Sequence, residues 1–175
     1  MSNILTEENG IYGIDCSKAV WATDEVHERY HEAKIHVLKD ADFIIETEEN
    51  LLVVEYKNST IQQAEKPENF QPLDDKMVNS IALKFYGTLH YLAILNKQKP
   101  KRYVYVVEAK NSDSTMRLKL RNRIMKELPF KLQEDMNAGA ALIEGLEVLS
   151  IEEWNRHKDY SLYPFVKLEN DLLNT

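Results

Sequence analysis

The stretch Leu51–Asn58, LLVVEYKN, constrains the fold more than any other part of the chain. Four apolar residues run directly into a glutamate, a tyrosine and a lysine, so the segment is typical of a strand whose character changes at its end. Side chains on a strand alternate in direction, which places Glu55 and Lys57 on one face and Tyr56 on the other. One face of this strand therefore carries an acid and an amine at the same end.

A second apolar segment, ADFIIET at 41–47, precedes this strand and has an acid near its start, Asp42. The polar residues between the two segments predict a hairpin. A loop of even length, either two residues (48–49) or four (47–50), places Asp42 directly opposite Glu55, whereas a loop of three turns Asp42 to the other face. We expect the even loop. The opposite face is then an apolar set suited to packing beneath a helix: Phe43, Ile45, Leu52, Val54 and Tyr56.

The remaining apolar patterns predict an α/β domain with a mixed sheet, because the hairpin strands are antiparallel and the later strands are separated by helices. Ser150 and Glu153 have the spacing of a capping box. The predicted elements are a helix at 24–33, a strand at 34–38, a connection at 58–73, a deeply buried helix from Asp74 or Asp75 to about 95, a central strand at 102–109, a basic helix at 114–128, and a strand followed by a helix near 146–154.

Length and composition favour one soluble globular domain over residues 1–175. The chain is 43% hydrophobic and 29% charged, which is ordinary for such a domain. No basic region followed by an apolar stretch opens the chain, and no segment approaches the roughly 20 apolar residues that span a bilayer. We therefore expect a cytoplasmic protein without a membrane partner. Cys16 is the single cysteine, so a bound metal would have mainly oxygen ligands.

Charge is distributed unevenly along the chain. The net charge is −7, yet residues 1–56 hold 13 acids and 4 bases, whereas residues 97–131 hold 3 acids and 11 bases. Two interpretations stay open at this point. The basic stretch is either an ordinary solvated helix face or a surface that attracts phosphates beside an acidic pocket.

The expected register brings Asp42 and Glu55 side by side at one end of the hairpin. Two adjacent carboxylates repel each other, which raises the pKa of one of them unless a cation compensates. Oxygen ligands are those that Mg²⁺ and Mn²⁺ prefer. Lys57 is then placed to hold or activate a water molecule and to stabilise charge that develops on a phosphate.

The residues ADFII followed by LLVVEYK resemble the signature of the PD-(D/E)xK nuclease superfamily, in which an Asp on one strand precedes Glu-x-Lys on the next. The helix predicted before these strands, and the helix and strand predicted after them, agree with that resemblance, which covers about residues 20–110. Ala41 stands where the motif name has proline. The resemblance implies a restriction-endonuclease-like fold, a mixed central sheet flanked by helices.

The resemblance also implies a nuclease that depends on Mg²⁺ or Mn²⁺ and hydrolyses phosphodiester bonds, in DNA more than in RNA. Asp42, Glu55 and the backbone carbonyl of Tyr56 would surround the metal, and Lys57 would position the attacking water. The family often contributes a further acid from its first helix, for which Glu25, Glu28 and Glu32 are all available. Glu32 lies nearest the strand, whereas Glu28 is nearer the middle of the helix. Basic residues expected to hold phosphates are Arg117, Lys119, Arg121 and Arg123.

A different class of function stays open. A noncatalytic descendant of the same fold would act as a nucleic-acid-binding or protein-assembly module, and the acidic net charge favours it. Taken singly, Glu55 and Lys57 are compatible with a surface charge pair and Asp42 with the end of a turn. The three together favour the enzyme. A homodimer is compatible with a small domain that cuts a duplex.

Several other polar residues receive a structural interpretation. His27 and His31 have helical i, i+4 spacing but are better explained as a solvent-facing pair than as zinc ligands. Lys84 lies among apolar residues of the 74–95 helix and is expected to extend to water. Gln62 and Gln63 follow the strand on the polar connection and are treated as loop residues rather than phosphate ligands.

Overall fold

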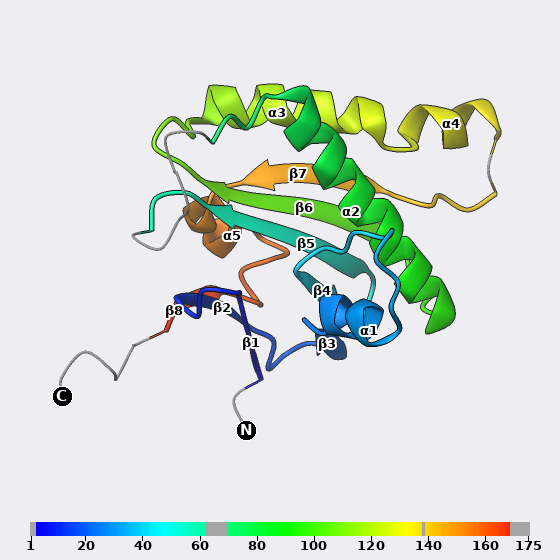
Figure 1. Ribbon diagram of the computed structural model, residues 1–175, viewed down its shortest axis with the longest axis horizontal. Coiled ribbons are helices and arrows are strands. Elements are labelled where there is room, and N and C mark those ends of the chain that lie inside the picture. Colours follow the sequence, from blue (N-terminus) through cyan, green and yellow to red (C-terminus); the bar gives the residue numbers. More distant parts are fainter. Residues whose placement is uncertain (1–2, 62–69, 138, 169–175) are drawn as a thin grey trace.

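The computed structural model describes residues 3–61, 70–137 and 139–168, so Gln62 and Gln63 lie outside the described residues. It contains a five-stranded sheet of order β3-β4-β5-β6-β7 and a three-stranded sheet of order β1-β2-β8 (Figure 1). The elements are β1 (Ile4–Thr6), β2 (Tyr12–Asp15), β3 (Trp21–Thr23), α1 (Val26–Glu32), β4 (Phe43–Glu46), β5 (Leu51–Asn58), α2 (Asp75–Ile94), β6 (Lys101–Glu108), α3 (Ser114–Glu127), α4 (Phe130–Asp135), β7 (Gly145–Leu149), α5 (Ile151–Arg156) and β8 (Phe165–Lys167).

The five-stranded sheet is mixed, as expected. Strand β4 is antiparallel to β3 and β5, whereas β5, β6 and β7 are parallel to one another. The predicted central position of β6 is confirmed, because β6 lies between β5 and β7. Tyr103 and Tyr105 on β6 are almost completely buried, and the Tyr103 hydroxyl donates to the carbonyl of Ile81 at 2.8 Å. These aromatic residues therefore belong to the core.

The hairpin of β4 and β5 has the predicted even loop of four residues. Phe43 pairs with Val54 and Glu46 pairs with Leu51, which leaves 47–50 as the loop. Thr47 closes this loop, because its backbone N–H donates to the Asn50 carbonyl at 2.8 Å. Extending the same register by one residue places Asp42 opposite Glu55, as the sequence analysis expects.

Each face of the five-stranded sheet has its own core. Helices α2 and α3 cover one face (Figure 1). On the other face the predicted apolar set is buried, but its cover is the small sheet and α5 with the segment that follows it, rather than one helix lying across it. Trp154, Tyr160, Tyr163 and Phe165 are the buried aromatic residues of this cover. The strands of the small sheet contain only three or four residues each, too few to show strand periodicity in a sequence.

The predicted strand at 34–38 is wrong. This segment has no regular secondary structure, and Val37 is 89% exposed. Lys34 adopts a left-handed conformation with φ of 58°, and the N–H of Ile35 donates to the Tyr30 carbonyl at 2.9 Å. These features end α1 and lead the chain away from the sheet. The edge strand is instead β3, which comes before α1.

The long helices and the capping box are close to expectation. Helices α2 and α3 begin and end within one or two residues of the predicted ranges. In the capping box the Ser150 hydroxyl accepts from the Glu153 N–H at 3.1 Å, and the Glu153 carboxylate accepts from the Ser150 N–H at 2.9 Å. Within the described residues, no helix is both long enough and apolar enough to cross a membrane.

A close contact between α2 and residues 39–41 fixes the start of β4. A Cβ atom built on Gly87 would lie only 1.8 Å from the carbonyl oxygen of Lys39. One residue later, the Thr88 hydroxyl accepts from the N–H of Ala41 at 2.9 Å and donates to the carbonyl of Lys84 at 2.8 Å. The absence of a side chain at Gly87 therefore allows the backbone that leads into Asp42 to lie directly against the helix.

Candidate functional site

Asp42 and Glu55 face a common positive charge. Lys84 extends from α2, and its Nζ donates to Glu55 Oε1 at 2.7 Å and to Oε2 at 2.9 Å. The same Nζ lies 3.8 Å from Asp42 Oδ1. The other Asp42 oxygen, Oδ2, accepts from the backbone N–H of Tyr56 at 2.7 Å. The two carboxylates, one directly before β4 and one on β5, thus converge on one cation.

Because Glu55 is buried, its negative charge needs a nearby cation. The Glu55 side chain is 8% exposed, that of Lys84 27% and that of Asp42 35%. Burial and repulsion from Asp42 raise the pKa of Glu55 to about 8, although Lys84 acts in the opposite direction. Partial burial also raises the pKa of Asp42, against the effect of Lys84 and the Tyr56 N–H. Burial of Lys84 disfavours its charge, but Glu55 and Asp42 outweigh that effect and raise its pKa above the usual value.

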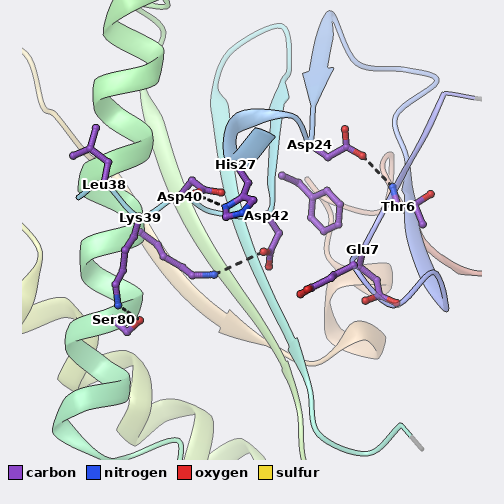
Figure 2. A pocket seen from close by; sticks show the side chains of 12 residues that line it. Thr6, Glu7, Asp24, His27, Leu38, Lys39, Asp40, Asp42 and Ser80 are labelled. Carbon is purple, nitrogen blue, oxygen red and sulfur yellow. Dashed lines mark hydrogen bonds and ion pairs between the residues drawn. The ribbon is translucent and has the colours of Figure 1, made fainter. Parts of the chain in front are cut away.

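A cavity of about 530 Å³ lies beside these residues, which is within the range of small-molecule sites. Asp42 and Lys84 are part of its lining. Figure 2 shows Lys39 and Ser80 on one side of the cavity and Thr6 and Asp24 on the other. Acids outnumber lysines in its lining, which includes Glu7, Glu8, Asp24, Asp40 and Asp42 beside Lys39 and Lys84.

Lys57 lies at the exposed end of β5, as its alternation with Tyr56 predicts. It lines a smaller hollow of about 70 Å³ together with Asp42 and the turn between β1 and β2. Tyr56 is buried on the opposite face of the sheet, in the core below the small sheet. Lys57 and Asp42 therefore line one hollow, whereas Glu55 on the same face of β5 pairs with Lys84. A role for the Tyr56 carbonyl as a metal ligand stays a prediction.

The turn between β1 and β2 forms one wall of the site, which the sequence analysis missed. Glu7 is buried there, and its carboxylate accepts from the N–H groups of Asn9 and Ile11 at 2.8 and 2.7 Å. Glu8 is exposed and adds to the repulsion that raises the pKa of Asp42. The signal available in the sequence was the turn-forming run EENG, which ends 32 residues before Asp42 and does not indicate that contact.

The acid expected from the first helix is not among the described residues that line the cavity. Glu28 and Glu32 are both exposed on α1, and Glu32 pairs with Arg29 at 3.4 Å. Asp40 lies in the lining instead. Its side chain is 12% exposed and lies 3.3 Å from Nδ1 of His27. Asp40 lies two residues before Asp42, and side chains at this spacing in an extended segment point to the same side. The sequence therefore contained a signal for Asp40 as a site residue.

Lys84 does not extend to water in the way the sequence analysis expects. Three and four residues away on α2 lie Ile81 and Thr88, which are buried, so Lys84 belongs to the face that packs on the sheet. A lysine on a buried helix face requires a charged or polar partner. This rule predicts an acid opposite Lys84, but the sequence does not indicate which acid.

Most of the predicted phosphate-binding residues have partners within the protein. Lys119 is exposed, whereas Arg117 is buried and Arg121 and Arg123 are partly buried. The contacts of the three arginines join α3 to neighbouring segments of the protein. Arg117 pairs with Glu153 at 2.7 Å, Arg121 donates to the Leu146 carbonyl at 2.9 Å, and Arg123 pairs with Asp75.

The histidines contribute one contact to the site. His27 is exposed and lies beside Asp40, whereas His31 is exposed and packs edge-on against His36 with ring centroids 5.9 Å apart. Within the ranges that the structure describes, no three or more His, Cys, Asp or Glu side chains are grouped as a metal cluster.

Comparison of the chain with protein-family models, with curated proteins and with solved structures gave no match. The assignment of a function therefore depends on the geometry of the Asp42, Glu55 and Lys84 group and on the cavity beside it.

Proposed function

We propose that this protein is a metal-dependent nuclease with a restriction-endonuclease-like fold that hydrolyses phosphodiester bonds, in DNA in preference to RNA. One observation carries the proposal: the carboxylates of Asp42, directly before β4, and of Glu55 on the adjacent antiparallel β5 converge on a single cation beside a cavity of about 530 Å³. A buried acid beside a second, partly buried acid is costly to the fold, so their presence at a cavity favours a functional role.

The donor set fits Mg²⁺ or Mn²⁺. Both ions prefer oxygen ligands, and Mg²⁺ is commonly held by one or two carboxylates together with water and substrate phosphates. Asp42 and Glu55 supply such carboxylates, and the Tyr56 carbonyl is the proposed backbone ligand. When bound, the metal would neutralise charge on a phosphate and make a coordinated water more acidic.

The protein's own residues have separate roles in this proposal. The Tyr56 N–H fixes the orientation of Asp42 through its hydrogen bond of 2.7 Å. Lys57, next to Asp42 at the end of β5, holds a water molecule and stabilises negative charge that develops on the phosphate. The acids Glu8, Asp24 and Asp40 repel a phosphate that no cation has neutralised, which makes substrate approach depend on the metal.

A cleavage panel tests this function. Labelled single-stranded, duplex and branched DNA and RNA are incubated with the full chain and Mg²⁺ or Mn²⁺, and parallel samples contain EDTA. We expect cleavage only with metal. The Asp42→Asn variant is expected to lower the rate by about 100-fold or more, because a carboxylate ligand is lost. Asp135→Asn, an exposed site on α4, is the matched control and is expected to retain the wild-type rate. Wild-type protein that cuts no substrate with either metal contradicts the proposal.

A noncatalytic module is the second candidate, and Lys84 is the observation that favours it. Its ammonium already neutralises part of the charge on Asp42 and Glu55, so the fold does not require a metal. Absence of cleavage together with absence of metal binding in calorimetry would favour a nucleic-acid-binding or protein-assembly role. A homodimer stays a prediction for either function, and sedimentation equilibrium measures it directly.

A further inference from the structure

We propose that Lys84 is an exchangeable internal counter-ion: its ammonium holds Asp42 and Glu55 in the metal-free protein, and a divalent metal binds by displacing it. This inference rests on the metal site of the proposed function. It adds a residue outside the Asp and Glu-x-Lys signature that determines how tightly the site takes its metal.

Lys84 and a metal compete for the same oxygen atoms. The Nζ atom contacts both oxygens of Glu55, at 2.7 and 2.9 Å, and lies 3.8 Å from Asp42. A small divalent ion needs ligand oxygens at about 2.1 Å, which would place it within a few ångströms of the ammonium. Two positive charges that close repel strongly where water is scarce. Metal binding therefore requires the ammonium to leave Glu55.

The surroundings allow Lys84 to leave but do not allow Glu55 to remain without a cation. Glu55 is 8% exposed, so water does not stabilise its charge, whereas Lys84 is 27% exposed and borders the cavity. A lysine ammonium is compact, strongly hydrated and carried on a flexible stem. Asp40 lines the same cavity and offers a second acid to the displaced ammonium.

Only the side chain of Lys84 has to move. Its backbone carbonyl accepts a hydrogen bond from the Thr88 hydroxyl at 2.8 Å, and Gly87 on the same helix lies against the Lys39 backbone. These contacts fix α2 in place. The exchange of lysine for metal thus leaves the sheet and the helix where they are.

The test compares Lys84→Gln with Lys39→Gln. Lys39 lines the same cavity but donates to the Ser80 hydroxyl at 3.0 Å rather than to a carboxylate, so its variant loses the same charge without freeing the acids. Mn²⁺ binding is measured by calorimetry, and melting temperatures are measured in EDTA and with saturating Mn²⁺.

We expect Lys84→Gln to bind Mn²⁺ at least about tenfold more tightly than the wild type, because the metal no longer displaces an ammonium. In EDTA its melting temperature is expected to fall by about 5 °C or more, since two acids lose their counter-ion, and Mn²⁺ is expected to restore most of that loss. Lys39→Gln is expected to stay within about twofold of the wild type in Mn²⁺ affinity.

A folded Lys84→Gln protein that binds Mn²⁺ no more tightly than the wild type overturns the proposal. Absence of Mn²⁺ binding to both proteins also overturns it, because Lys84 would then be a fixed counter-ion. Tighter binding without cleavage of any nucleic acid would instead remove the nuclease function and leave the exchange in place.

If Lys84→Gln does not fold, Lys84→Arg is used, because a guanidinium holds a carboxylate through two bonds and is harder to displace. Its Mn²⁺ affinity is expected to fall several-fold, and an unchanged affinity counts against the exchange.

Discussion

Replacing Gly87 by alanine is expected to destabilise the protein by about 3 kcal/mol or more. In the interior of a helix this substitution normally stabilises by about 1 kcal/mol, because alanine is the better helix former. Here the new Cβ would lie 1.8 Å from the Lys39 carbonyl oxygen and 2.9 Å from its carbonyl carbon. Both are backbone atoms, so α2 and the segment leading to Asp42 have to separate. The sign of the effect is therefore opposite to that set by helix propensity.

Urea denaturation measures this loss. Gly139→Ala is the control, since a Cβ at Gly139 has no other atom within 4 Å, and it is expected to change stability by less than about 0.5 kcal/mol. Because the same contact positions Asp42, any folded Gly87→Ala protein is also expected to lose metal affinity. A Gly87→Ala protein as stable as the wild type would show that this contact is not close.

Replacing Lys57 by alanine is expected to reduce cleavage by about 100-fold to 1,000-fold, the usual loss when a group that stabilises developing charge is removed. Lys57 is exposed at the end of β5 and lines the small hollow beside Asp42. Its loss is therefore expected to change the free energy of unfolding by no more than about 0.5 kcal/mol and to leave metal affinity nearly unchanged. A loss of rate without a loss of stability or of metal distinguishes this role from that of Lys84.

Lys18→Ala is the control for Lys57→Ala. Lys18 is exposed before β3 and is not among the described residues that line the cavity or the smaller hollow. Single-turnover cleavage by both variants is compared with the wild type at saturating metal. Wild-type rates for Lys57→Ala would exclude Lys57 from the chemistry and direct attention to the two lysines that line the cavity, Lys39 and Lys84.

The hairpin that carries the acids could be predicted because its constraints are local. Alternation fixes which side chains share a face, and an even loop then sets Asp42 opposite Glu55. The structure has that loop at 47–50. Helix α2 could be predicted equally well, since Val78, Ile81 and Phe85 have helical spacing. All three are buried in the structure.

The parts of the site that the sequence does not reveal depend on contacts between distant segments. Lys84 meets Glu55 across 29 residues, and Glu7 and Glu8 reach the cavity from the start of the chain. The short strands β1, β2 and β8 show no period, so the sheet they form is invisible in the sequence. The segment at 34–38 shows the converse error, because Ile35 and Val37 alternate like a strand in a segment that is irregular.

The role of the basic residues is a further feature that the sequence alone does not determine. Eleven bases between residues 97 and 131 are compatible with a phosphate-binding surface, but composition does not distinguish a free guanidinium from one that holds two elements together. Arg117 spans from α3 to Glu153 on α5, and Arg121 reaches a carbonyl of β7. Only the packing of α3 determines which of these groups contact neighbouring elements.

Locating the metal in a crystal tests the proposed site most directly. In a crystal of the protein soaked with Mn²⁺, the anomalous difference map is expected to show a peak about 2.1 Å from one carboxylate oxygen each of Asp42 and Glu55, with the Lys84 ammonium moved away from Glu55. No peak at this position at saturating Mn²⁺, with Lys84 still in contact with Glu55, would contradict both the metal site and the nuclease function built on it.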